Sequence, residues 1–188
     1  MKKWLNALLM ASSLTGCVVY PTERVYLQPI IHTATSNTAA SELVASQSCG
    51  YHAAKYDGLK QTLSDSTMTV YPSYVEDEPL SFTLVARSSV ADSADALQMK
   101  ENIRVVINDD KSSVYPFAVV QIFERRQGEV ISRWYKAEIE VPAKNVRSLG
   151  IYVKPFMQMD TSGAEPPEIE FNFEKATVSD IYYGSINC

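Results

Sequence analysis

Residues 80–86 read Leu-Ser-Phe-Thr-Leu-Val-Ala, and apolar side chains alternate with polar ones over most of this stretch. Successive side chains of a strand point to opposite faces, so this period of two places Phe82 and its leucine neighbours on one buried face. Residues 103–107 (Ile-Arg-Val-Val-Ile) repeat the pattern and run into an Asn-Asp-Asp sequence at 108–110 that is typical of a turn. The two stretches predict strands of a half-buried sheet.

The same period recurs along the rest of the chain. Long apolar-rich runs at 115–125 and 129–141 flank Arg-Gln-Gly at 126–128, where the glycine can take the positive φ of a hairpin loop. Further strands are predicted at 68–75, 149–157, 169–174 and 177–183, with the apolar side chains of 169, 171 and 173 facing inward. The pattern predicts an all-β (β-rich) fold, an antiparallel β-sandwich of about seven to eight strands.

Two stretches depart from this period. Tyr56, Leu59 and Leu63 recur at helical spacing, which predicts a short helix near residues 51–63. Residues 88–102 (SSVADSADALQMKEN) fit either a long loop or a short helix.

The first residues have the composition of an export signal. Lys2 and Lys3 form a basic start, and residues 4–13 are mostly apolar. A transmembrane helix needs about 20 apolar residues, so this segment is too short to span a membrane.

The segment closes with Leu14-Thr15-Gly16-Cys17, which resembles the lipobox of bacterial lipoproteins. The resemblance implies that residues 1–16 are a signal peptide cleaved before Cys17. It also implies that the Cys17 thiol carries a diacylglycerol and that the new amino group of Cys17 carries a fatty acid such as palmitate. In that family an Asp after the cysteine retains the protein at the inner membrane. Val18 stands there, which implies lipid anchoring in a bacterial outer membrane, facing the periplasm. The alternative is an ordinary secretory signal that leaves Cys17 as a structural cysteine.

Removing 16 of the 188 residues leaves a mature chain long enough for one domain and a tether. Residues 33–48 are rich in Thr, Ser and Ala, which bury little surface. We therefore expect the lipidated cysteine and a flexible tether over residues 17–47, with room for a first strand at 24–31, and a β-sandwich domain over residues 48–188.

Lipidation of Cys17 leaves Cys49 and Cys188. An even pair of cysteines in an oxidising envelope compartment predicts a disulfide bond between them. The alternative is two unpaired thiols.

The charge of the chain excludes some classes of partner. Its net charge is −5, and removing Lys2 and Lys3 with the signal makes the mature chain more acidic still. A general nucleic-acid binder needs a basic surface, so no nucleic-acid partner is expected. The same charge gives no reason to expect attachment to anionic lipid through protein charge.

Residues suited to catalysis or metal binding are few. The chain has two histidines, His32 and His52, and His32 falls in the expected tether. We assign no catalytic residue, metal ligand or cofactor, because no nucleophile, zinc or phosphate-binding motif is present. Asp109 and Asp110, or the acidic run 76–78, could hold calcium loosely but are better explained as solvated turns.

Two features suggest binding instead. The chain has eleven tyrosines, which are enriched at interfaces but also favoured in strands, and residues 159–168 form an acidic, proline-marked loop. These features predict a non-enzymatic envelope lipoprotein that binds a basic protein partner, by analogy a tether of a secretion machine or a toxin-immunity lipoprotein. The alternative is a small envelope hydrolase or glycan-binding enzyme.

Overall fold

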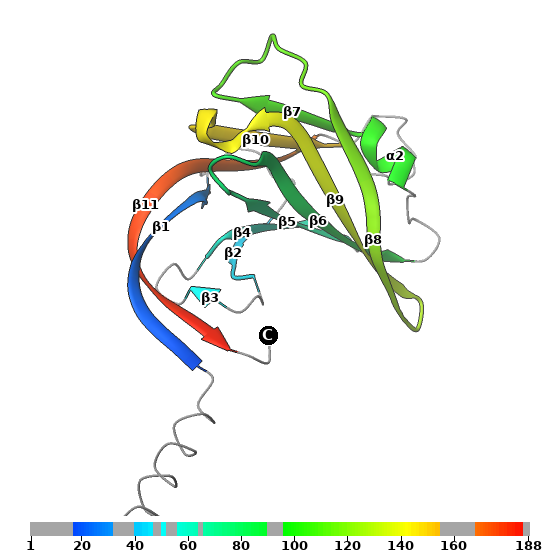
Figure 1. Ribbon diagram of the computed structural model, residues 1–188. Helices are drawn as coiled ribbons and strands as arrows, with labels where there is room; N and C mark the ends of the chain where they lie inside the picture. Colours follow the sequence, from blue (N-terminus) through cyan, green and yellow to red (C-terminus); the bar gives the residue numbers. More distant parts are fainter. Residues whose placement is uncertain are drawn as a thin grey trace, which may run out of the picture. The chain divides into compact units, whose positions relative to one another are not determined.

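The computed structural model describes residues 17–31, 40–46, 50–51, 56–63, 66–89, 96–154 and 168–185. Within these ranges the chain forms eleven strands, one α-helix and one 3-10 helix (Figure 1). The strands are β1 (Cys17–Ile30), β2 (Ala40–Val44), β3 (Gly50–Tyr51), β4 (Gly58–Leu63), β5 (Ser66–Ser73), β6 (Pro79–Ser89), β7 (Ile103–Ile107), β8 (Phe117–Gln127), β9 (Val130–Pro142), β10 (Ser148–Val153) and β11 (Ile169–Ser185). The helices are α2 (Ala96–Glu101) and η2 (Ala143–Asn145).

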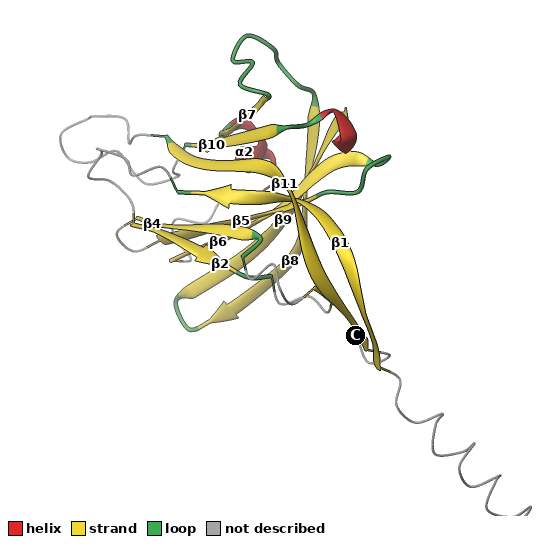
Figure 2. Cartoon of the chain, turned by 90° about the vertical axis from the view of Figure 1, so that its left-hand side faces the viewer, coloured by secondary structure: helices red, strands yellow, loops and turns green. Residues whose placement is uncertain are grey.

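The strands form two sheets (Figure 2). One has the order β1-β11-β10-β7, with β3 also paired to β11, and the other has the order β2-β4-β5-β6-β9-β8. Every pairing with a defined register is antiparallel. The predicted antiparallel, sandwich-like β fold is confirmed.

The chain divides into two compact units. The larger unit consists of Val25–Ser46 and Tyr56–Ala176, and the smaller of Met1–Arg24, Gln47–Lys55 and Thr177–Cys188. Strands β1 and β11 each contribute residues to both units.

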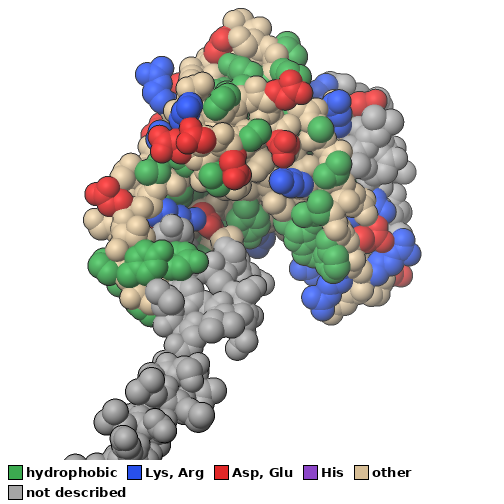
Figure 3. All heavy atoms as spheres, in the orientation of Figure 1, with side chains coloured by type: hydrophobic (Ala, Val, Ile, Leu, Met, Phe, Trp, Pro, Cys, Tyr) green, Lys and Arg blue, Asp and Glu red, His purple; other side chains and the backbone are tan. Residues whose placement is uncertain are grey.

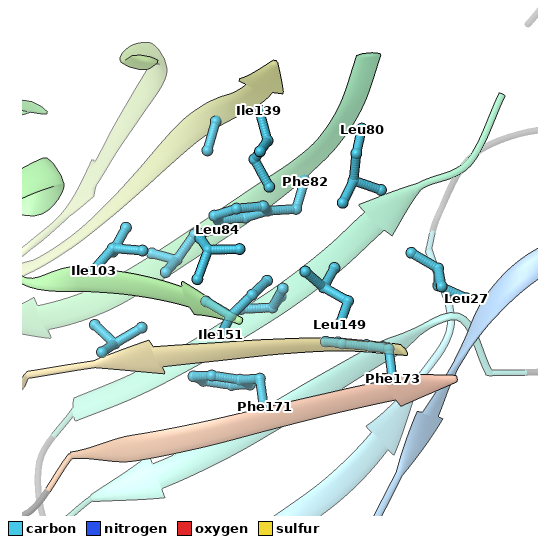
Figure 4. Packing of buried hydrophobic residues seen from close by; sticks show 14 of the residues in the cluster. Leu27, Leu80, Phe82, Leu84, Ile103, Ile139, Leu149, Ile151, Phe171 and Phe173 are labelled. Atoms are coloured by element: carbon cyan, nitrogen blue, oxygen red, sulfur yellow. The ribbon is translucent and has the colours of Figure 1, made fainter. Parts of the chain in front are cut away.

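The core of the larger unit lies between its two sheets (Figure 4). Leu80, Phe82 and Leu84 of β6 are at most 1% exposed, as the alternation at 80–86 predicts. They meet Ile151 of β10 and Phe171 of β11 from the opposite sheet, in one cluster of buried residues. Each fully buried side chain of this size contributes roughly 1.5–3 kcal/mol, so the alternating strands account for much of the stability.

Most strands agree with the sequence pattern. The bounds of β7 are those predicted, and β5, β6, β8, β9 and β10 differ from prediction mainly at their ends. The stretches 169–174 and 177–183 form a single strand, β11, and the uncertain segment 88–102 contains the short helix α2. The turns also agree, since Asn108, Asp109 and Gly128 have positive φ angles.

The helix predicted near residues 51–63 is wrong. Tyr51 belongs to β3 and residues 58–63 form β4, which pairs with β2 and β5. The alternation along β4 is hidden because Leu59 is followed on the inner face by a polar residue, Gln61, which is only 6% exposed. The Gln61 side chain is satisfied there, accepting from Ser41 Oγ at 2.9 Å and donating to the Glu170 carbonyl at 3.1 Å.

The flexible tether expected over residues 17–47 is also corrected. The described parts of this range form β1, which begins at Cys17, and β2. Tyr26 and Leu27 of β1 are 7% and 1% exposed, and Leu27 belongs to the core cluster. The strand for which the sequence left room at 24–31 lies within β1 except for Ile31, whereas the Thr-, Ser- and Ala-rich composition of residues 33–48 gave no sign of β2.

Candidate binding surface

Strand β8 is the outermost strand of its sheet, next to β9. Its first residues alternate between half-buried and exposed, with Phe117 and Val119 packed against the core. From Val120 to Gln127 every residue is exposed. Figure 1 shows α2 beside β8, on the side away from the hairpin that joins β8 to β9. The half of β8 nearest this hairpin therefore presents its side chains to solvent.

A β-bulge changes the direction of the side chains in this half. Gln121 pairs with Tyr135, whereas Phe123 pairs with Trp134, so Ile122 is an extra residue on β8. Tyr135 is buried in the core, and its neighbour Trp134 lies on the outer face of the sheet. The bulge thus places Phe123 opposite Trp134 on the outer face, whereas unbroken alternation would direct it inward like Val119.

The bulge gathers four apolar side chains, which we call the β8 cluster: Val120, Ile122, Phe123 and Trp134. The first three are 53%, 53% and 56% exposed. The rings of Phe123 and Trp134 meet edge to face with centroids 5.0 Å apart, a favourable aromatic geometry. Single exposed apolar residues are common on protein surfaces, but a contiguous group containing two large aromatic rings is typical of an interaction site.

Charged side chains of both signs lie near the β8 cluster. Residues 121–136 contain Arg125, Arg126, Arg133 and Lys136 against two glutamates, in a chain whose net charge is −5. The Arg133 guanidinium donates to Glu124 Oε2 at 2.9 Å, and this hydrogen bond holds the pKa of Glu124 below its usual value. Figure 3 shows apolar side chains toward the β8–β9 hairpin, with both Lys or Arg and Asp or Glu side chains beside them. Lys136 also pairs with Glu138 at 3.7 Å, and over the whole hairpin, residues 117–142, four cations stand against four glutamates. The charge around the cluster is therefore balanced.

The tyrosines occupy other positions. Tyr135 is buried, and others such as Tyr152 are half-buried. The Tyr152 hydroxyl donates to Glu170 at 2.9 Å, and Arg104 lies 4.0 Å above the Tyr152 ring centroid while pairing with Glu168. Burial and the Glu170 contact raise the pKa of Tyr152 to about 12. Tyrosine content alone did not locate the β8 cluster, because these tyrosines pack within the sheets.

The acidic turns hold their own hydrogen bonds. Asp110 accepts from the Ser112 amide at 3.0 Å, the Ser112 hydroxyl at 2.6 Å and the Ser113 hydroxyl, and these bonds lower its pKa to about 2. Asp77 pairs with Lys144 at 3.0 Å. Among the described residues no three His, Cys, Asp or Glu side chains are grouped to hold a metal ion.

Comparisons with family models, curated proteins and solved structures find no match to this chain. In the part of the chain that the structure describes, no helix has the length and apolar character needed to cross a membrane. The signal residues 1–16, both histidines, Cys49, Cys188 and residues 155–167 lie outside the described residues, as does the side chain of Cys17. Residues 155–167 include the end of the strand predicted at 149–157 and the acidic loop predicted at 159–168, except for Glu168.

Proposed function

We propose that this protein is an envelope lipoprotein, anchored through acyl chains on Cys17, that binds a partner protein through the β8 cluster without catalysing a reaction. The observation that carries the binding role is the exposure of Phe123 beside Trp134 on the bulged edge strand. Tryptophan and arginine are enriched among the few residues that dominate binding energies, and both occur here. Ion pairs such as that of Arg133 with Glu124 adjoin the cluster, and complementary charge on a partner would guide association and fix its specificity.

Site-specific photocrosslinking in the native host tests the binding role. A photoreactive residue at position 123 should crosslink to one discrete protein, whereas one at Val114, which is 93% exposed, should not. Val120→Ser should weaken the crosslink at position 123, and Val114→Ser provides a control with the same chemical change. Loss of two buried carbon atoms costs about 1.6 kcal/mol at about 0.8 kcal/mol per CH₂, which is about a 15-fold loss of affinity. Equal crosslinking at positions 114 and 123 would contradict the proposal.

The anchor is tested separately. Cys17→Ser should leave an unlipidated precursor and abolish labelling by a fatty-acid analogue. In a host with an outer membrane, Val18→Asp should move the protein to the inner-membrane fraction. Undiminished labelling of the Cys17→Ser variant would show that the acyl chains are attached elsewhere.

A further inference from the structure

The smaller unit contains a ribbon of strands next to the proposed acylation site. Its described parts are residues 17–24 of β1, residues 177–185 of β11 and strand β3. β1 neighbours β11, and β3 pairs with β11 through Tyr51 opposite Tyr182. We call these residues the tyrosine ribbon.

The tyrosine ribbon exposes apolar side chains on both faces. Tyr20 and Tyr182 lie on one face, since their ring centroids are 5.2 Å apart. Val19 and Ile181 precede them and therefore point to the opposite face. Val19 is 57%, Tyr20 46% and Ile181 49% exposed. A sheet that faces water usually has one polar side, so exposure of apolar groups on both sides indicates a less polar environment.

The position of the ribbon in the chain identifies that environment. β1 begins at Cys17, so extended backbone follows the proposed acylation site directly. At a rise of about 3.3 Å per residue, Val19 and Tyr20 lie roughly 7–10 Å from Cys17. The headgroup layer on each side of a bilayer is roughly 5–8 Å thick. Acyl chains inserted from Cys17 would therefore hold these side chains at the membrane interface.

We propose that the tyrosine ribbon lies in the interfacial layer of the membrane that holds the acyl chains, with Tyr20 and Tyr182 at the level of the lipid headgroups. The proposal rests on acylation of Cys17. Tyrosine is enriched at this level because its ring is apolar and its hydroxyl polar. The described side chains of the ribbon include Glu23, Arg24 and Asp180, so they carry no excess of positive charge. The contact therefore depends on apolar and aromatic groups and is insensitive to salt.

Tryptophan fluorescence in vesicles tests this placement. The background is the acylated chain with Trp134→Phe, which has no tryptophan once residues 1–16 are removed. A single probe is then introduced as Tyr20→Trp or as Ile181→Trp. Each variant is reconstituted into vesicles of phosphatidylethanolamine and phosphatidylglycerol. Lipids brominated near the headgroup should quench both probes at least twofold and at any salt concentration. Val114→Trp in the same background is the control and should be quenched less. Two probes on opposite faces keep the test valid if one variant folds poorly.

The other outcomes overturn the proposal in distinguishable ways. If the protein floats with the vesicles but both ribbon probes stay unquenched, the anchor stands and the ribbon faces water or another protein. If position 114 is quenched as strongly as positions 20 and 181, the contact belongs to the domain as a whole and not to the ribbon. If the protein neither incorporates fatty acid nor floats, the proposed anchor fails and the membrane placement fails with it.

Discussion

Leu27 provides a direct test of whether β1 belongs to the core or to a tether. Its side chain is 1% exposed and packs within the core cluster. Leu27→Ala removes three carbon atoms, which loses about 2.4 kcal/mol of transfer free energy at about 0.8 kcal/mol per CH₂. The residual cavity adds to this loss, so we expect a decrease of about 2–5 kcal/mol in the free energy of unfolding.

Urea denaturation of the exported, unacylated Cys17→Ser chain measures this loss, and melting gives an independent value. For a chain of this size each kcal/mol lowers Tm by about 2–4 °C. The matched control is Gln28→Ala, because Gln28 is the exposed neighbour of Leu27 on the same strand and its loss should cost at most about 0.5 kcal/mol. If Leu27→Ala costs no more than Gln28→Ala, β1 is not part of the core and the assignment of residues 25–30 to the larger unit is wrong.

Three further predictions concern the cysteines, an acidic turn and a glycine. Peptide mapping of the exported protein without reductant should recover a peptide pair linked through Cys49 and Cys188, and two alkylatable thiols would contradict the disulfide. An NMR titration of the Asp110 carboxyl should give a pKa of about 2. Because this pKa is lower in the folded than in the unfolded chain, its contribution to stability is complete above about pH 4 and is lost as pH falls toward 2. A titration midpoint near the ordinary value of about 3.9 would refute the hydrogen bonding. Gly58→Ala should lower Tm because the new Cβ would overlap the Tyr71 ring. The decrease should be smaller when Gly58→Ala is made in a chain that already carries Tyr71→Ala. An unchanged Tm of the Gly58→Ala single variant would argue against this packing.

The sequence predicted the strands that bury one apolar face. In residues 80–86 of β6 and 169–173 of β11 each inward residue is apolar, so the period of two is plain. β4 escaped detection because Gln61 occupies an inward position, and its burial depends on hydrogen bonds to Ser41 and Glu170 that lie 20 and 109 residues away in the chain. Local pattern cannot reveal partners at such distances.

The candidate binding surface was less predictable than the fold. The run that forms β8 was identified as a strand, but strict alternation would have directed Phe123 toward the core. Its outward direction depends on the bulge at Ile122, which is defined only by the register against Tyr135 and Trp134 of β9. Composition directed attention instead to the tyrosines, of which Tyr26 and Tyr135 are buried and Tyr20 and Tyr56 are exposed but lie outside β8.

The sheet edges also affect how copies of the chain meet one another. Acylation at Cys17 would confine the protein to a membrane surface, where crowding favours edge-to-edge aggregation of exposed strands. The edge strands β2 and β7 have five residues each, whereas β8 has eleven and β1, at the edge of the other sheet, has fourteen. On β8 the bulge at Ile122 interrupts the regular ladder, and Glu124, Arg125 and Arg126 add charge beside it. The same irregularity that turns Phe123 outward therefore makes the longer edge of this sheet a poor template for pairing with a second copy.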